Sequence, residues 1–156
     1  MQEKQNLEKV KLLARDLRDG KQYPRSPRET LGGYVIAARV LDKCRAVLAG
    51  TEGEYKYNNP MDIVFFEFAG ITAEAFKDFV ATGAADEAVG EWIKANAKQK
   101  ERIEVVKWNN LQRYKTLRER PGESQLRLED YIAANHPKGA VVYHWFDVLD
   151  IEEGRL

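Results

Sequence analysis

Cysteine and histidine are scarce in this chain, and their scarcity limits the chemistry that it can carry. The 156 residues include one cysteine, Cys44, and two histidines. A single cysteine cannot form an internal disulfide, which suits a reducing compartment. One cysteine with two histidines is also a thin set of ligands for a zinc site. We therefore expect no disulfide, no metal and no cofactor.

Long apolar runs and an excess of charge of one sign are lacking as well. Lys plus Arg and Asp plus Glu each number 25, so the chain has no large field to attract nucleic acid or an anionic membrane. The longest apolar run, at residues 140–146 and interrupted by His144, is far shorter than the roughly 20 residues that span a bilayer. The first residues lack the apolar stretch of a secretory signal. We expect a cytoplasmic protein that binds neither nucleic acid nor a membrane.

Apolar and charged residues are present in the proportions of an ordinary globular protein. Hydrophobic residues make up 44% of the chain and charged residues 32%, which is too apolar for a disordered protein. The length is close to that of a usual single domain. We expect one helical domain over residues 1–156, in which residues 121–156 could form a C-terminal extension packed on the main body.

Apolar residues recur at helical spacing along most of the chain, which predicts an all-α fold of about six or seven helices. Residues 140–153 fit either a strand or a helix, and we favour a helix over 144–153 while leaving a short C-terminal β element open. Apart from this ambiguous C-terminal segment, the expected helices cover about 3–18, 27–49, 60–69, 73–82, 86–97, 99–119 and 125–135.

The start of the second expected helix has the strongest local signal in the chain. Ser26 is a good N-cap, Pro27 suits the first helical position, and Glu29 completes a capping box. Gly32 and Gly33 in the first turns would each cost about 1 kcal/mol relative to alanine. We expect either a closely packed neighbouring backbone or a bound ligand at these glycines.

Four segments of the chain together resemble a known family. They are DLRDG at residues 16–20, PRSPRE at 24–29, LDKCR at 41–45 and WFDVLD at 145–150. In combination they are similar to the bacterial domain-of-unknown-function family numbered 5069, over roughly residues 14–154. The resemblance implies a small bacterial helical protein, and it brings no activity, cofactor or catalytic residue to this chain.

The loop of residues 23–28 is the leading candidate site for a ligand. Two arginines flank a serine at an expected helix start, where free backbone N–H groups and the helix dipole favour an anion. The guanidinium groups could bind a phosphate or a carboxylate. The alternative, which we favour, is a helix cap whose arginines are solvated or paired with Asp16 and Asp19. The candidate ligand-binding residues are Tyr23, Arg25, Ser26 and Arg28.

Other candidate residues have simpler structural interpretations. Cys44 lies between two cations, but it occupies a dense apolar helix, so we expect a buried, unreactive thiol. His136 and His144 fit no familiar zinc spacing. The loop at residues 55–59 is rich in tyrosine and asparagine, which suits either a small-molecule contact or a loop folded over the core. Residues 72–96 have the pattern of a helix-turn-helix, but the second helix starts with acidic residues that DNA phosphates would repel.

The sequence contains no paired nucleophile and base, which favours a non-enzymatic binding or regulatory protein. Its partner would be a protein or a small molecule, and its oligomeric state is open. The alternative is an enzyme or ligand-handling protein that acts on a phosphorylated or carboxylated metabolite at the loop of residues 23–28. A cleft beside Ser26, with both arginines pointing into it, would favour this alternative.

Overall fold

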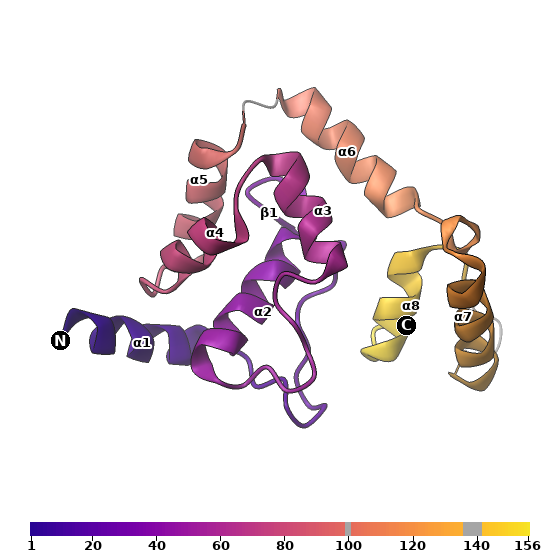
Figure 1. Ribbon diagram of the computed structural model, residues 1–156, viewed down its shortest axis with the longest axis horizontal. Helices are drawn as coiled ribbons and strands as arrows, with labels where there is room; N and C mark the ends of the chain where they lie inside the picture. The colour runs from indigo at the N-terminus through magenta and orange to yellow at the C-terminus, as the bar shows by residue number, and fades with distance from the viewer. Residues whose placement is uncertain (99–100, 136–141) are drawn as a thin grey trace. The chain divides into compact units, whose positions relative to one another are not determined.

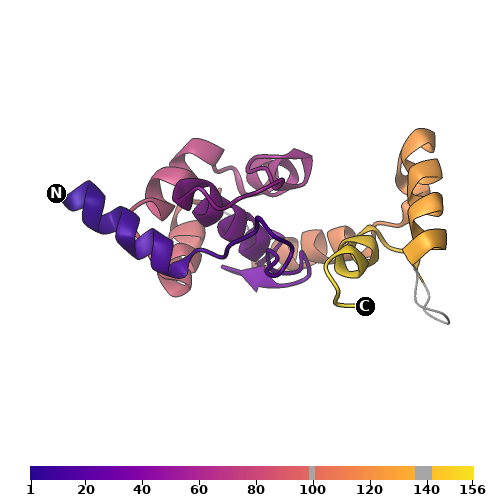
Figure 2. The same cartoon turned by 90° about the horizontal axis from the view of Figure 1, so that it is seen from below.

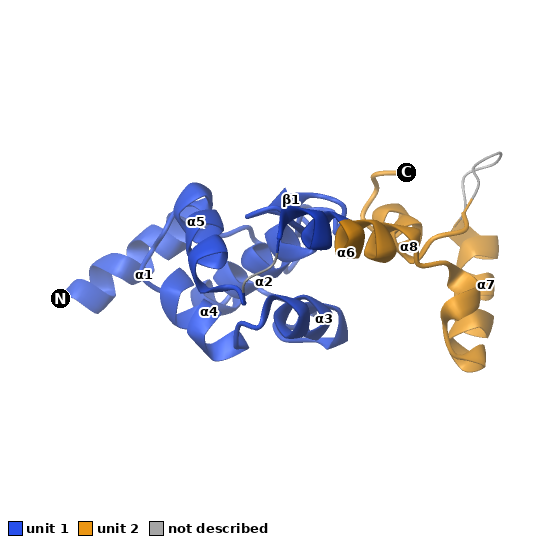
Figure 3. Ribbon diagram, turned by 90° about the horizontal axis from the view of Figure 1, so that it is seen from above, with its two compact units in different colours: residues 1–106 blue, residues 107–156 orange. Residues whose placement is uncertain are grey.

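The computed structural model describes residues 1–98, 101–135 and 142–156. These residues form eight α-helices and one two-stranded sheet, so the all-α prediction is confirmed. The chain divides into two compact units, Met1–Val106 and Lys107–Leu156, and the boundary falls inside helix α6 (Figure 3). The prediction of a single domain over residues 1–156 stays a prediction.

The first unit is built around helix α2, which contacts α1, α3, α4 and strand β1 (Figure 1). Every residue of α2 from Ala37 to Ala46 is buried. Helix α2 is therefore a central helix covered on several sides. The elements of this unit are α1 (Gln2–Leu13), β1 (Thr30–Leu31), β2 (Tyr34–Val35), α2 (Ala37–Ala49), α3 (Pro60–Ala69), α4 (Ala73–Val80) and α5 (Asp86–Asn96).

Aromatic rings from three helices form the core beside α2. The ring of Phe76 lies 5.6 Å from that of Phe66 and 6.0 Å from that of Trp92, both edge to face. Trp92 also stacks on Phe79, with ring centroids 5.3 Å apart. Burial of each large apolar side chain contributes roughly 1.5–3 kcal/mol, so this cluster fixes α4 and α5 against α3.

Local capping signals place helices α3 and α4 correctly. The side chain of Asn59 accepts the Asp62 N–H at 3.0 Å, and that of Thr72 accepts the Ala75 N–H at 3.0 Å. Gly70 ends α3 with a φ of 71°. These contacts lie within one helical turn of each cap, and therefore the sequence alone is enough to predict them.

The predicted helix over residues 27–49 is wrong in its first ten residues. Gly32 and Gly33 have φ values of 60° and 89° and form the two-residue turn of the β1–β2 hairpin, a geometry that glycine permits. A Cβ on Gly32 would lie 2.9 Å from the carbonyl oxygen of Gly90. The expected close approach of a neighbouring backbone is thus confirmed at Gly32, whereas nothing in the described chain lies within 4 Å of the Cβ position of Gly33. Both glycines lie in a hairpin and not in a helix.

The predicted helix over residues 3–18 is too long by one turn. Helix α1 ends at Leu13, and Ala14 is extended. The reason is tertiary, because the N–H of Leu17 donates to the carbonyl of Thr51 at 2.8 Å, which draws this segment away from the helix axis. The first turn of α1 projects from the rest of the unit (Figures 1 and 2).

The second unit contains most of α6 (Arg102–Tyr114), the 3₁₀ turn η1 (Leu117–Glu119), α7 (Gly122–Asn135) and α8 (Trp145–Glu152). Helices α7 and α8 contact each other. The predicted helix over 99–119 is divided between α6 and η1, and residues 99–100 lie outside the described residues. The preference for a helix over 144–153 is confirmed, and an antiparallel bridge joins Thr116 to His144.

Candidate functional site

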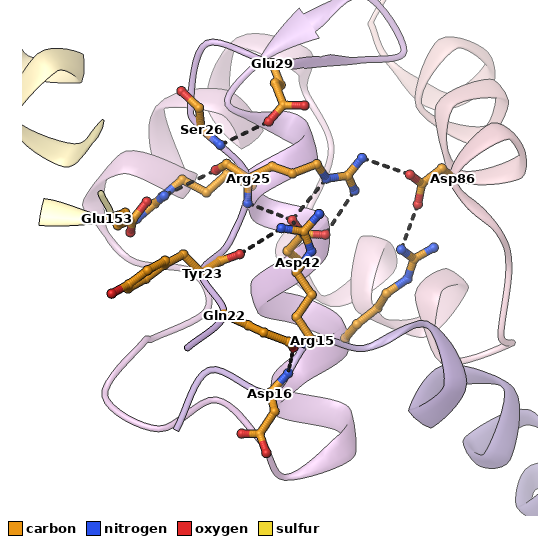
Figure 4. A network of polar contacts seen from close by, with 12 residues as sticks. Arg15, Asp16, Gln22, Tyr23, Arg25, Ser26, Glu29, Asp42, Asp86 and Glu153 are labelled. Carbon is orange, nitrogen blue, oxygen red and sulfur yellow. Dashed lines mark hydrogen bonds and ion pairs between the residues drawn. The ribbon is translucent and has the colours of Figure 1, made fainter. Parts of the chain in front are cut away.

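The loop between α1 and β1 carries the predicted ligand residues and lies against α2 (Figure 4). Arg15, just after α1, donates a guanidinium N–H to the backbone carbonyl of Tyr23 at 2.9 Å. This bond holds together the two ends of the segment over residues 15–23. The residues that follow Tyr23 then lie beside the charged side chains of α2.

Arg25 is bound to Asp42 of α2 through three hydrogen bonds. The backbone N–H and the Nε–H of Arg25 both donate to Oδ2 of Asp42, at 2.8 and 3.0 Å. The terminal guanidinium nitrogen donates to Oδ1 at 3.0 Å. The Asp42 side chain is only 4% exposed and that of Arg25 is 17% exposed. This bidentate pair therefore lies mostly away from water, where charge-assisted bonds are strong.

Asp86 extends the network from α2 to the first turn of α5. It accepts one hydrogen bond from Arg25 at 2.8 Å and one from Arg45 at 2.7 Å. Partial burial raises the pKa of Asp86, but the hydrogen bond from Arg45 and the charges of both arginines lower it more, so its pKa lies below the ordinary value. The Asp86 side chain remains 44% exposed, so this carboxylate lies where the network meets solvent.

An open hollow of about 570 Å³ lies beside this network. Its volume falls within the roughly 300–1,000 Å³ of small-molecule pockets. Both apolar and charged side chains contribute to its wall. The lining residues are Leu13, Arg15, Arg25, Asp42, Arg45, Ala85, Asp86 and Glu87.

Among the three arginines that line the hollow, Arg15 has the most N–H groups left for a ligand. Its side chain is 43% exposed, and its Nε lies 3.7 Å from Oδ2 of Asp42. A guanidinium has five N–H donors, and within the described chain the guanidinium of Arg15 makes one hydrogen bond, to the Tyr23 carbonyl. The remaining N–H groups can therefore donate to an anion without disturbing the pairing of Arg25.

Only one of the four predicted ligand residues lines the hollow, namely Arg25. Tyr23 contributes its backbone carbonyl to Arg15. Ser26 is buried, and its Oγ accepts the N–H of Arg28 at 3.2 Å. Anion binding by Tyr23, Ser26 and Arg28 stays a prediction, and these residues do not lie on the wall of the hollow.

The predicted capping box at Ser26 is present in part and stabilises a turn. The carboxylate of Glu29 accepts the Ser26 N–H at 3.3 Å, as predicted. The Ser26 hydroxyl, however, accepts from Arg28 and not from Glu29. No helix follows, because the chain enters the hairpin at Thr30.

Four residues of the site are not predicted from the sequence, namely Arg15, Asp42, Arg45 and Asp86. Asp42 and Arg45 interrupt the apolar face of α2, and buried charges of this kind require partners. That interruption is a usable signal in the sequence. It identifies a buried ion pair but not the partner, because Arg25 and Asp86 are 17 and 41 residues away from their respective partners on α2.

A second buried ion pair joins α2 to α3. The Nζ of Lys43 lies 2.6 Å from Oδ1 of Asp62, and both side chains are almost completely buried. The other oxygen of Asp62 accepts the N–H of Asn58 at 2.9 Å. Breaking such a pair costs about 3–5 kcal/mol because it leaves one buried charge unpaired. Loss of either partner would therefore destabilise the fold, and the buried pair is closed to a ligand.

Cys44 is buried, as predicted. Burial raises the pKa of its thiol to about 12, and the nearby cations lower it only in part. Because the thiolate is the reactive form, this cysteine is not available as a nucleophile near neutral pH.

The tyrosine-rich loop at residues 55–59 is folded over the core. The hydroxyl of Tyr57 donates to the carbonyl of Ala73 at 2.6 Å, and its ring packs edge to face on that of Phe66. The guanidinium of Arg39 lies 5.7 Å from the ring centroid of Tyr55. These contacts support the structural alternative for this loop.

The histidines offer no metal site within the described residues. His136 lies outside them. His144 precedes α8, where its Nδ1 lies 3.5 Å from Oδ2 of Asp147. In the part of the chain that the structure describes, no three His, Cys, Asp or Glu side chains are placed to hold a metal ion.

A protein-family model described as a domain of unknown function (DUF5069) matches residues 21–155. The chain belongs to this family. The resemblance carried by the four sequence segments is thereby confirmed. The matched range includes Arg25, Asp42, Arg45 and Asp86, whereas Arg15 precedes it. A search of curated proteins finds none that matches the chain. Among the described helices, none has both the length and the apolar character needed to cross a membrane.

Proposed function

We propose that the protein is a non-enzymatic binding protein of the bacterial cytoplasm. Its ligand is a small carboxylated or phosphorylated molecule, which it holds in the arginine-lined hollow beside the loop of residues 23–28. The observation that carries this proposal is the convergence of Arg15, Arg25 and Arg45 on one hollow of about 570 Å³. Arginine suits this role because its planar donors match carboxylate and phosphate oxygens.

The distribution of charge favours Arg15 as the contact for the anionic group of the ligand. Arg25 and Arg45 are already engaged by Asp42 and Asp86. An anion close to the half-exposed Asp86 would be repelled, whereas Arg15 is half-exposed and keeps most of its donors. A few charge-assisted bonds of about 1.5–3 kcal/mol each correspond to a dissociation constant of about 1 mM for a bare anion.

The chemistry of the other side chains supports binding over catalysis. The thiol of Cys44 is buried with a raised pKa, and therefore a thiolate nucleophile is not poised near the hollow. The acidic residues in the wall are engaged by arginines or lie at the start of α5. The balanced net charge of the chain supports a small-molecule ligand over nucleic acid or an anionic membrane.

Thermal unfolding with added anions tests the proposal. Inorganic phosphate and citrate are titrated to about 10 mM at constant ionic strength, with sodium chloride as the reference. A ligand at ten times its dissociation constant stabilises the folded state by about 1.4 kcal/mol, which raises the Tm by roughly 3–6 °C for a chain of this size. We expect this rise for at least one of the two anions.

Arg15→Gln and Arg18→Gln form the matched pair of variants. Arg18 lies three residues from Arg15, is exposed, and pairs with Asp16 outside the hollow. Arg15→Gln should abolish the anion-dependent rise, and Arg18→Gln should keep it. An equal response of the wild type and both variants would show that the anions act on the chain in general, and would refute the proposal.

A further inference from the structure

The second unit contains a pocket of about 360 Å³ between α7 and α8. Ser124, Arg127, Leu128 and Tyr131 line one side of it, at the spacing that places residues on one face of a helix. Trp145 and Glu152 of α8 and Arg120, just before α7, complete the lining. The volume lies at the lower end of the range of small-molecule pockets.

Arg120 is held in this pocket by an aromatic contact. Its guanidinium carbon lies 4.5 Å from the ring centroid of Trp145, a cation–π distance. Its Nε is buried and has no hydrogen-bond partner in the part of the chain that the structure describes. A buried donor of a charged group is costly when it is not hydrogen-bonded. The ring contact fixes the face of the guanidinium and leaves the edge with the N–H groups for an acceptor.

Three further side chains add donors to the same pocket. The guanidinium of Arg127 donates to the hydroxyl oxygen of Ser124 at 3.2 Å. A hydroxyl that accepts a hydrogen bond retains its own proton for donation. Burial and the charge of Glu152 raise the pKa of Tyr131, so its hydroxyl also remains a donor. Two arginines against one glutamate leave this pocket with a positive balance.

The wall of the pocket is apolar as well as cationic. Leu128 and the rings of Tyr131 and Trp145 line the same space. We propose that this pocket binds a small molecule in which a carboxylate or phosphate is attached to an aromatic or aliphatic body. The anionic group meets Arg120, Arg127 and Ser124, and the body lies against Leu128 and the two rings. This site is separate from the hollow of the first unit and does not depend on its function.

Fluorescence of Trp145 tests this assignment directly. The double substitution Trp92→Phe and Trp108→Phe leaves Trp145 as the single tryptophan of the chain. Phenyl phosphate, benzoate and inorganic phosphate serve as the probes. We expect a saturable change of emission with phenyl phosphate or benzoate, and at least tenfold weaker binding of inorganic phosphate. Equal binding of all three probes would refute an apolar component of the site.

Variants of the chain with its natural tryptophans provide the control by calorimetry. Arg120→Gln and Arg127→Gln should each weaken the binding of the same probe by roughly tenfold or more, since each removes charge-assisted bonds. Arg118→Gln, at an exposed position of η1 that does not line the pocket, should bind like the wild type. Arg15→Gln should also bind normally, which separates this site from the first hollow. The proposal would be overturned if all four variants bound the probe like the wild type, or if all four lost binding.

Discussion

The carboxylate of Asp42 accepts both the backbone N–H and two side-chain N–H groups of Arg25. One buried side chain of α2 therefore fixes both the backbone and the side chain of the loop. The loop of residues 23–28 is thus fixed to α2, and Arg25 is held in position without a ligand.

Replacement of Arg25 by alanine should destabilise the protein strongly. The variant leaves Asp42, which is 4% exposed, without its main partner, and a buried charge that loses its partner costs about 3 kcal/mol or more. Chemical denaturation measures the difference. Lys21→Ala is the control in the same loop, because Lys21 is 84% exposed, and it should change stability by less than about 0.5 kcal/mol. Equal stability of the two variants would contradict the role of the Arg25–Asp42 pair.

Replacement of Ser26 by alanine should have a smaller effect. The change removes the hydroxyl that accepts the Arg28 N–H, and a hydrogen bond of this kind contributes about 1 kcal/mol. The same denaturation experiment measures it. A loss as large as that of Arg25→Ala would show that the turn, and not the ion pair, holds the loop.

Stability should fall in acid through Asp86, whose pKa is lowered in the folded protein. A carboxyl with a lowered folded-state pKa stabilises the fold above its unfolded-state pKa of about 3.9, and this contribution disappears as the pH falls through the folded-state value. The free energy of unfolding should therefore decrease less between pH 6 and pH 2 for Asp86→Asn than for the wild type. The same decrease in both proteins would mean that Asp86 does not contribute to the pH dependence of stability.

Cys44 should react slowly with a thiol reagent in the native protein. Its burial and a pKa of about 12 leave almost no thiolate at pH 8. We expect one thiol per chain to react rapidly only after addition of denaturant. Rapid labelling without denaturant would contradict the buried position of this residue.

The sequence predicts helices α3 and α4 because their signals are local. Asn59, Thr72 and Gly70 each act on backbone within one turn of themselves. The hairpin at Gly32 and Gly33 was misread as helix because two glycines weaken a helix and permit a turn equally well. The close approach of Gly90 that decides between them comes from a distant segment.

The candidate site depends almost entirely on long-range pairing, which explains why the sequence reveals only part of it. Arg25 was found because it lies beside Ser26 and Arg28 in a recognisable motif. Its partners Asp42 and Asp86 are 17 and 61 residues away, and nothing local connects them. The buried Lys43–Asp62 pair shows the same limit. The sequence shows that Lys43 is a charge within an apolar helix, but only the structure identifies Asp62 as its partner.

The most direct test of ligand binding at the hollow is an NMR titration that follows the arginine Nε–H signals. Phosphate or citrate is added to isotopically labelled wild-type protein, with Arg15→Gln and Arg18→Gln used to assign the two signals. We predict that the Arg15 signal shifts in a saturable manner with a dissociation constant of about 1 mM, while the Arg18 signal stays in place. Equal, non-saturating shifts of both signals, or no shift at Arg15, would contradict binding of the anion in the arginine-lined hollow.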